Sequence, residues 1–330
     1  MSSCEQGESA SGLQKIELQN RYVRLSILPA AGGKISELVD QQSGHNWLWH
    51  NPHVPFSNAV YDVDFGRHLD SGGWDEILLS TSAAKIQFEG GAVCRIPDHG
   101  DVVGQEWTVV DAGTNSSGDA SCEMSVCGRA LKYEFTRVIR LRHDNPALEV
   151  SYSLVNQDSF AWPWYWSLHA LVTGERDLKI ELPVEQEFRI DHVAGMDYDS
   201  TRDRYSWPHL PLLGHKSLDL SRSFESDNTR PGFASKIFVR SPDSGQVCLR
   251  ARDSTDKLNV RYDPIELPWL GLWINNDGWS GCDSKPYRNL GIEPATAAFD
   301  SISTAIEDGS LAWLQPEERR EWAISVDFQS

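Results

Sequence analysis

The chain has no run approaching the roughly 20 apolar residues that a membrane-spanning helix needs. Positive charge is also scarce, because 30 Lys and Arg residues stand against 48 Asp and Glu residues, giving a formal net charge of −18. Such a field repels a phosphate backbone, so we expect no nucleic-acid partner. Without a spanning segment we expect no membrane partner either. Both deficits predict a soluble protein.

Cysteine is present but not organised: the six cysteines are scattered, and no two of them form a CxxC pair. In a chain of 330 residues this pattern excludes a disulfide scaffold and a zinc ribbon. The first residues are polar, with neither a basic start nor an apolar stretch, so we do not interpret them as a signal peptide. We therefore expect reduced thiols in the cytoplasm and a flexible tail over residues 1–12.

Long stretches with the 3.6-residue period of an amphipathic helix are missing, and alternation of apolar and polar residues dominates instead. Residues 133–141 and 148–154 alternate on either side of a turn, which predicts a β-hairpin. The best helical candidate is 297–307. The unpatterned segment 192–228 reads as a long functional loop. Many short strands predict an all-β sandwich, and the absence of a linker favours a single domain over residues 13–330.

Three short segments each place one titratable side chain at the end of an apolar strand. They are His99 in Pro-Asp-His-Gly, His169 after a Trp-rich stretch, and Glu293 in Gly-Ile-Glu-Pro. Two histidines and a carboxylate in one cleft would supply an acid and a base near neutral pH. Taken singly, each of these residues is more often structural than catalytic. The 13 tryptophans offer flat surfaces for sugar rings, although core packing accounts for most of them.

In their order along the chain, these segments resemble the aldose 1-epimerases, also called galactose mutarotase-like proteins. The resemblance rests on motifs that follow one another from end to end: residues 29–38 (PAAGGKISEL), residues 72–76 (GGWDE), the segments of His99, His169 and Glu293, and residues 314–322 (LQPEERREW). It implies a β-supersandwich with one or two short helices. It also implies an isomerase that interconverts the α and β anomers of a sugar.

The resemblance assigns a role to each of the three titratable residues. Glu293 would take the proton of the C1 hydroxyl, His169 would protonate the ring oxygen so that the ring opens, and His99 would support the polarised oxygens. The base must start ionised and the acid protonated, which Glu and His satisfy at neutral pH. The acidic field of the protein would help to keep an imidazolium charged. No metal or organic cofactor is needed, and the implied partner is a small-molecule sugar, bound to a monomer or homodimer.

Contacts with the sugar are implied for a second set of residues: Arg67, Trp74, Asp75, Trp273 and Trp279. Arg67 could replace the substrate-binding arginine of the family. An anionic sugar (phosphorylated, sulfonated or uronic) would then be attractive, because a guanidinium binds such groups in a fork. A surface ion pair of Arg67 with Asp64 or Asp70 is an equally good interpretation. Arg202 and Arg204 are further candidates for contacting an anionic group.

Two other functions fit the same sequence less well. His45, His50 and His53 could bind a metal ion, but they have no carboxylate or thiolate at ligand spacing, so we expect no metal site. The chain could also be a non-catalytic carbohydrate-binding protein or the sandwich module of a polysaccharide-processing enzyme. The positions of His169 and Glu293 discriminate between these functions, because an epimerase needs both at one pocket and a binding module needs neither.

Overall fold

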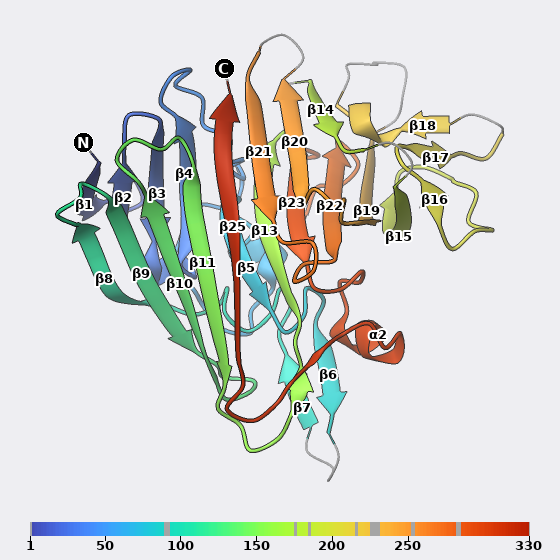
Figure 1. Ribbon diagram of the computed structural model, residues 1–330. Coiled ribbons are helices and arrows are strands. Elements are labelled where there is room, and N and C mark those ends of the chain that lie inside the picture. Colours follow the sequence, from blue (N-terminus) through green and yellow to red (C-terminus); the bar gives the residue numbers. More distant parts are fainter. Residues whose placement is uncertain are drawn as a thin grey trace.

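The computed structural model describes residues 2–88, 93–174, 177–183, 186–214, 217–224, 232–251, 255–281 and 285–329. Over these residues the chain forms two large antiparallel sheets that pack face to face as two layers (Figure 1). Helices are confined to a few short turns. The prediction of an all-β sandwich with one or two short α-helices is confirmed.

The first layer is a sheet of eleven strands in the described part of the chain. In spatial order its strands are β1 (Ser3–Glu8), β2 (Gln14–Gln19), β3 (Val23–Leu28), β4 (Lys34–Asp40), β5 (Trp74–Leu78), β13 (Trp166–Thr173), β23 (Arg288–Ala295), β22 (Trp269–Asn276), β19 (Phe233–Arg240), β15 (Glu187–Ala194) and β16 (Tyr205–Ser206).

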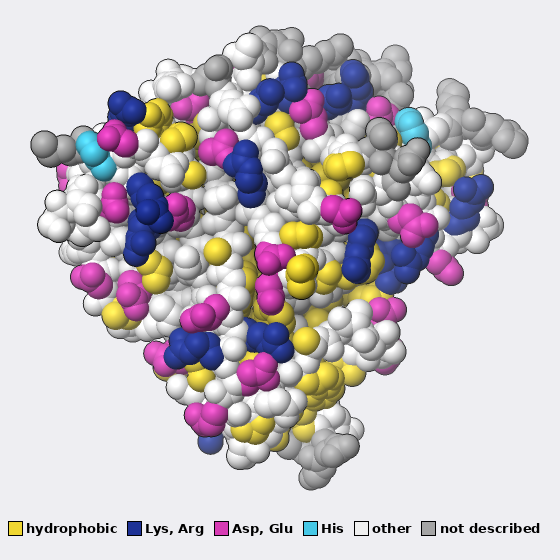
Figure 2. All heavy atoms as spheres, viewed as in Figure 1, with side chains coloured by type: hydrophobic (Ala, Val, Ile, Leu, Met, Phe, Trp, Pro, Cys, Tyr) yellow, Lys and Arg dark blue, Asp and Glu magenta, His cyan; other side chains and the backbone are white. Residues whose placement is uncertain are grey.

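The second layer has eight strands within the described ranges. In spatial order these are β14 (Leu178–Glu181), β20 (Gln246–Ala251), β21 (Lys257–Tyr262), β25 (Arg319–Gln329), β11 (Leu148–Asn156), β10 (Tyr133–Leu141), β9 (Ala120–Cys127) and β8 (Thr108–Thr114). Figure 2 views the molecule from this side and shows acidic and basic side chains interspersed over the face.

Short elements lie between the strands of the two large sheets. In the described part of the chain, three strand pairs stand outside those sheets: β12 (Trp162–Pro163) with β24 (Trp313–Leu314), β17 (His209–Pro211) with β18 (Ser217–Asp219), and β6 (Ala84–Gln87) with β7 (Val93–Ile96). The helical turns are η1 (Pro29–Ala31), α1 (Phe65–His68), η2 (Leu220–Arg222) and α2 (Ile302–Glu307). No helix found in the described ranges is long and apolar enough to cross a bilayer.

The predicted hairpin is confirmed. Strands β10 and β11 pair in antiparallel register from Tyr133 opposite Asn156 to Leu141 opposite Leu148. Along β10 every second residue is buried, as the alternation of the sequence requires for a sheet with one face on the core. The buried apolar residues of β10 join a hydrophobic cluster between the layers that runs from Ile16 to Val326, and the remaining buried residue, Arg137, is an ion-pair partner instead.

The expected flexible tail is wrong for Ser3–Glu8. These residues form β1, which pairs along its whole length with β2. A tight turn closed by the Ser9 amide on the Leu13 carbonyl (2.8 Å) joins the two strands. Most side chains of this edge strand are exposed. A strand without a buried face needs no alternation of apolar and polar residues. The pattern that predicts the other strands is therefore absent from β1.

The predicted helix begins later than expected. Helix α2 starts at Ile302 rather than residue 297, after the cap Ser301, whose hydroxyl accepts from the Thr304 amide at 3.4 Å. The preceding backbone is engaged elsewhere, because the Asp300 carbonyl accepts from the amides of Thr81 and Ser82 at 2.9 Å each.

The segment 192–228 also differs from the expected loop. It contributes the end of β15, all of β16, β17 and β18, and the helical turn η2. Its residues 215–216 and 225–228 lie outside the described ranges.

Candidate active site

A cavity of about 510 Å³ opens against the middle of the eleven-stranded sheet. This volume falls within the roughly 300–1,000 Å³ typical of small-molecule sites. On β22 and β23 the core residues Leu272 and Ile292 alternate with Trp273 and Glu293, which line the cavity. Successive side chains of a strand point to opposite faces, so the cavity lies on the face turned away from the eight-stranded layer.

Four consecutive strands supply the lining at this point. His169 comes from β13, Glu293 from β23, Trp273 from β22 and Lys236 from β19, and these strands neighbour one another in that order. His99 joins them from the turn that follows β7. The structure therefore brings His99, His169 and Glu293, which are far apart in sequence, to one cavity.

Glu293 is almost completely buried, with 1% of its surface exposed. Its Oε2 accepts a hydrogen bond from the Lys236 ammonium, and Lys236 Nζ also lies 3.3 Å from Asp300 Oδ1. Its Oε1 has no hydrogen-bond partner among the described residues. Burial raises the pKa of Glu293, and the charge of Lys236 opposes that shift. A buried oxygen without a donor is costly, so Oε1 is suited to accept from a ligand hydroxyl.

Two glycines make room for this carboxylate. Gly271 lies directly opposite Glu293 on β22, and Gly291 lies two residues before it on the same face of β23. A methyl group at position 291 would come within 2.5 Å of Glu293 Oε1, and one at position 271 within 3.2 Å of Glu293 Cβ. The absence of side chains at both positions leaves the space that the Glu293 carboxylate occupies.

The two histidines form a contact pair at the cavity, with ring centroids 5.3 Å apart and planes at 79°. The Phe65 ring stacks on His99 at 3.5 Å. The Asp98 carboxylate lies 3.2 Å from His99 Nδ1, and the His99 amide donates to the Thr81 carbonyl at 2.6 Å. His99 has φ of +60°, a left-handed conformation that is uncommon for residues other than glycine, and the turn holds it there.

His169 departs from the expectation that the acid starts as an imidazolium. Burial lowers its pKa well below the usual range, and the nearby charges of His99, Lys236 and Lys34 lower it further. At neutral pH the ring is therefore neutral, and one of its nitrogens carries a proton that can be donated in a hydrogen bond. The acidic net charge of the chain does not overcome this local effect.

Aromatic rings form one wall of the cavity. Trp273 and Trp279 both line it, with ring centroids 6.3 Å apart and planes at 87°. The His192 ring stacks near Trp273 at 6.4 Å. Trp279 is 43% exposed, which is unusual for such a large apolar side chain and leaves its surface available to a ligand.

The structure places Trp74 and Asp75 in the interior rather than on the cavity, contrary to the expected sugar contacts. Trp74 is 1% exposed and its indole N–H donates to Glu76 Oε1 at 3.1 Å. Asp75 is 2% exposed and pairs with the Lys34 ammonium. Both belong to β5, which is covered on its two faces, so that a motif expected to bind a sugar serves packing and charge compensation instead.

The arginines proposed for an anionic group are not among the described residues that line the cavity. Arg67, in the last turn of α1, points its Nε to within 3.5 Å of Asp64 Oδ2, which agrees with the surface ion pair weighed as the alternative. Arg202 and Arg204 are exposed and lie near Asp199 and Glu187. Because Asp64 lines the cavity, Arg67 lies at its edge, and a contact of Arg67 with a sugar stays a prediction.

Three charged residues of the site, Lys236, Asp191 and Asp70, were not foreseen from the sequence. Lys236 is the buried charge of the mostly apolar strand β19, whose other charged residue, Arg240, is exposed at its end. A lysine inside an apolar run could have identified it, because lysine is rarely buried without a partner. Asp191 lines the cavity from β15. Its pKa is raised to about 6, mainly by burial and secondly by the negative charge of the nearby Asp300. Asp70 lies on the same lining, accepts from the Tyr287 hydroxyl at 3.2 Å, and has its pKa raised by burial to about 6.

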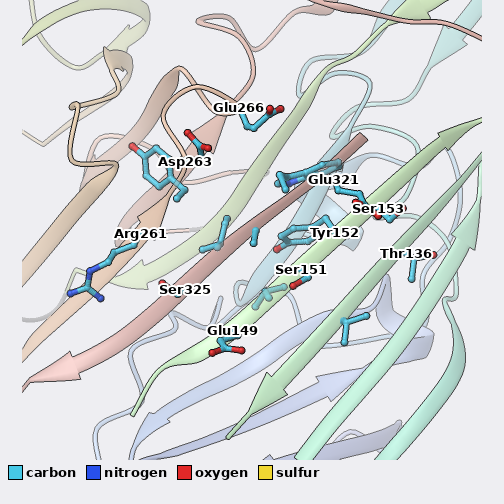
Figure 3. A pocket seen from close by; sticks show the side chains of 16 residues that line it. Thr136, Glu149, Ser151, Tyr152, Ser153, Arg261, Asp263, Glu266, Glu321 and Ser325 are labelled. Atoms are coloured by element: carbon cyan, nitrogen blue, oxygen red, sulfur yellow. The ribbon is translucent and has the colours of Figure 1, made fainter. Parts of the chain in front are cut away.

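Two other places in the molecule offer less for acid–base chemistry. In the described ranges no three His, Cys, Asp or Glu side chains are arranged to hold a metal ion, and His50 Nε2 contacts the Ser36 carbonyl at 2.6 Å. A shallow groove on the outer face of the eight-stranded sheet is bordered by short side chains such as Ser151, Ser153 and Ser325 (Figure 3). It has no histidine among its described lining, whereas the cavity has His99, His169 and His192.

Solved structures share this architecture over nearly the whole chain. A galactose mutarotase-like protein from Clostridium acetobutylicum matches with a TM-score of 0.67 and 14% identity, covering 99% of this chain and 98% of that one. A protein from Klebsiella pneumoniae named a "putative aldose 1-epimerase" matches with a TM-score of 0.68 and 12% identity, covering 98% and 83%. The chain has the galactose mutarotase-like fold.

A protein from Escherichia coli K12 that carries the same epimerase name matches this fold with a TM-score of 0.60 and 14% identity, covering 95% of this chain and 98% of that one. No model of a known protein family matches the sequence, and no curated protein matches it either. The galactose mutarotase-like fold is therefore recognised here through structure and through the short motifs, and the chemistry must be argued from the site.

Proposed function

We propose that the chain is an aldose 1-epimerase-like isomerase that interconverts the α and β anomers of a sugar in the cavity. The observation that carries the proposal is Glu293, a buried carboxylate with one unpartnered oxygen, on the same lining as His99 and His169. The nearby Trp273 and Trp279 offer faces on which a sugar ring can stack.

The reaction needs one proton acceptor and one proton donor. Glu293 takes the proton of the C1 hydroxyl while an imidazolium at His169 gives a proton to the ring oxygen, and the C1–O5 bond breaks to leave the open aldehyde. Rotation about C1–C2 presents the other face of the aldehyde. The ring then closes as Glu293 returns a proton to the C1 oxygen and His169 recovers one from the O5 hydroxyl. His99, beside His169, supports the polarised oxygens. Protons balance over the cycle.

The charges of the lining favour a neutral sugar over an anionic one. Its described carboxyl-bearing residues are Asp64, Asp70, Asp98, Asp191, Glu293 and Asp300. Among the described lining residues Lys236 is the only lysine or arginine, and two of these carboxylates already surround it. A phosphorylated, sulfonated or uronic sugar would meet like charge there, so the anionic substrate that Arg67 suggested is not part of the proposal.

The proposal also covers the organisation of the protein. One hydrophobic cluster joins both layers, which supports a single domain over residues 13–330. The described cysteines are free thiols, in keeping with the cytoplasm as the place of action. We propose that the protein works there as a monomer or homodimer.

The test is magnetisation-exchange NMR on a panel of neutral and anionic aldoses. We expect anomer exchange of a neutral sugar to exceed the buffer rate, Glu293→Gln to abolish the excess, and His169→Asn to lower it about 100-fold or more. Full exchange in Glu293→Gln would refute the assignment of the base, and an unchanged rate in His169→Asn would move the acid to His99. Saturation transfer to a bound sugar without exchange would instead favour the carbohydrate-binding protein, which the aromatic wall also suits.

A further inference from the structure

Lys236 occupies an environment that calls for an explanation. It is 3% exposed, in a strand that is otherwise mostly apolar, and its Nζ lies 5.2 Å from the centre of the Phe238 ring. Removing an ammonium from water is costly unless opposite charges receive it. Two do so here, since Lys236 contacts Oε2 of Glu293 and lies 3.3 Å from Oδ1 of Asp300.

The ion pair reaches across a whole strand. Lys236 stands on β19 and Glu293 on β23, with β22 between them. The residue of β22 opposite Glu293 is Gly271, which also lies opposite Phe238. A methyl group at position 271 would approach both Glu293 Cβ and Phe238 Cε1 to 3.2 Å. Glycine leaves this space open, so the fold allows the carboxylate and the ammonium to meet over β22.

The ion pair with Lys236 makes the two carboxylate oxygens of Glu293 different from each other. Oε2 is held by Lys236, whereas Oε1 lies over Gly291 without a described partner. Gly291 is opposite Leu171 on one side and Trp273 on the other, and both of those side chains line the cavity. An oxygen at this place is the one that can accept from a bound sugar.

We propose that Lys236 is a positioning residue for the base: its ion pair fixes Oε2 of Glu293, turns Oε1 toward the sugar, and keeps the carboxylate charged. Asp300 completes the arrangement by sharing the ammonium. This inference rests on the proposed function, because it assigns Glu293 as the proton acceptor.

Lys236 itself stays charged and does not react. Burial alone would lower its pKa, but the charges of Asp300 and Glu293 outweigh burial and raise it. An ammonium has no lone pair, so Lys236 does not form an imine with the open aldehyde. Its effect must pass through the charge and the position of Glu293.

The charged groups around Glu293 set the direction of each expected change. Lys236 from β19 and His99 from the turn after β7 favour the carboxylate, whereas Asp300, which follows β23, disfavours it. The other titratable groups on the strands that line the cavity, among the described residues, are His169 on β13 and Asp191 and His192 on β15. Removing the lysine charge must therefore raise the pKa of Glu293, and removing the Asp300 charge must lower it.

The experiment follows the carboxyl carbon of Glu293 by NMR in protein labelled with ¹³C-glutamate, with Glu293→Gln identifying the signal. In Lys236→Met we expect its titration to move up by about one pH unit or more. Anomer exchange should fall about 10- to 100-fold at pH 7. Lys236→Arg keeps the charge and should retain most of the wild-type titration. Asp300→Asn should move the titration down, an opposite sign that general loss of structure would not produce.

Lys34→Met is the matched control for burial, since Lys34 is an equally buried lysine paired with Asp75 on neighbouring strands of the same sheet. It should leave the Glu293 titration in place. An unchanged titration in both Lys236→Met and Asp300→Asn would overturn the inference. If the titrations move as expected while the wild-type protein accelerates no anomer exchange, the proposed function fails and the ion-pair geometry stands.

Discussion

The protein environment shifts the pKa of Glu293 and the pKa of His169, the two residues proposed for proton transfer, in opposite directions. Burial raises the pKa of Glu293 and lowers that of His169 well below its usual range. Proton transfer to the ring oxygen requires Glu293 ionised and His169 protonated at the same time. Lowering the pH protonates His169 but also Glu293, and raising it ionises Glu293 but also removes the proton of His169. The combination is therefore most populated at an intermediate pH.

This arrangement predicts a bell-shaped dependence of catalysed anomer exchange on pH, with its maximum on the acid side of pH 7. The alkaline limb reports loss of the His169 proton, and the acid limb reports protonation of Glu293. Magnetisation-exchange NMR between pH 5 and 9, with the buffer rate subtracted at each point, measures it. If the catalysed rate instead rose steadily with pH to a plateau, His169 would act only as a neutral hydrogen-bond donor.

Strand β23 shows how an element shapes the site through a residue that has no side chain. Alanine at position 291 would place a methyl group 2.5 Å from Glu293 Oε1 and 2.9 Å from Trp273 Cβ. We expect Gly291→Ala to displace the carboxylate and reduce exchange about 100-fold, since small misplacements of a catalytic group have effects of that order. The NMR exchange rate, compared with the urea midpoint of unfolding, measures how far the loss is catalytic.

Gly113→Ala in β8 is the control, because a methyl group at that position meets open space and its backbone has no positive φ. It should leave the exchange rate as in the wild-type chain. An exchange rate of Gly291→Ala equal to that of this control would mean that the carboxylate does not depend on the gap.

Elements with one buried face could be predicted from the sequence, and elements without one could not. The hairpin of β10 and β11 alternates strictly, and its limits follow from that alternation. Strand β1 exposes most of its side chains and relies on backbone pairing with β2, which leaves no trace in the order of apolar residues. The start of α2 depends on a backbone contact of Asp300 with residues 81 and 82, which are distant in sequence.

Local sequence patterns also explain which site residues could be predicted and which could not. The sequence places each of His99, His169 and Glu293 at the end of an apolar strand, but only His99 follows one, after β7; His169 lies inside β13 and Glu293 inside β23. Their apolar neighbours along the chain still allowed these segments to be recognised locally. Whether Asp75 faces a ligand depends on Lys34, a partner 41 positions earlier that covers its charge. The role of Lys236 depends on two carboxylates more than 50 positions later in the chain. Pairings of this kind require the folded sheet, which the linear pattern does not contain.

At the scale of the whole molecule, a buried ionic group joins the two layers. Glu76 on β5 belongs to the eleven-stranded sheet, and Arg137 on β10 and Tyr152 on β11 belong to the other. Glu76 Oε1 accepts from Arg137 Nη1 and from the Tyr152 hydroxyl at 3.0 Å each. Both members of the ion pair are fully inaccessible to solvent. The contact between the layers therefore contains a buried ion pair, and each of its two charges depends on the other.

Arg137→Met should lower the free energy of unfolding by about 3–5 kcal/mol, the range for a buried pair that loses one partner. Burial already raises the pKa of Glu76 to about 7 although Arg137 opposes it, so removing Arg137 must raise it further. The folded variant then binds a proton that the unfolded chain, with its ordinary glutamate pKa near 4.5, does not hold at neutral pH. The stability of the variant consequently falls as pH rises, and the loss caused by the mutation should be larger at pH 9 than at pH 6.

Urea unfolding at both pH values measures this loss of stability. The double variant Arg137→Met with Glu76→Gln should recover part of the loss at pH 9. A loss of equal size at the two pH values would show that Glu76 does not carry an uncompensated charge between the layers.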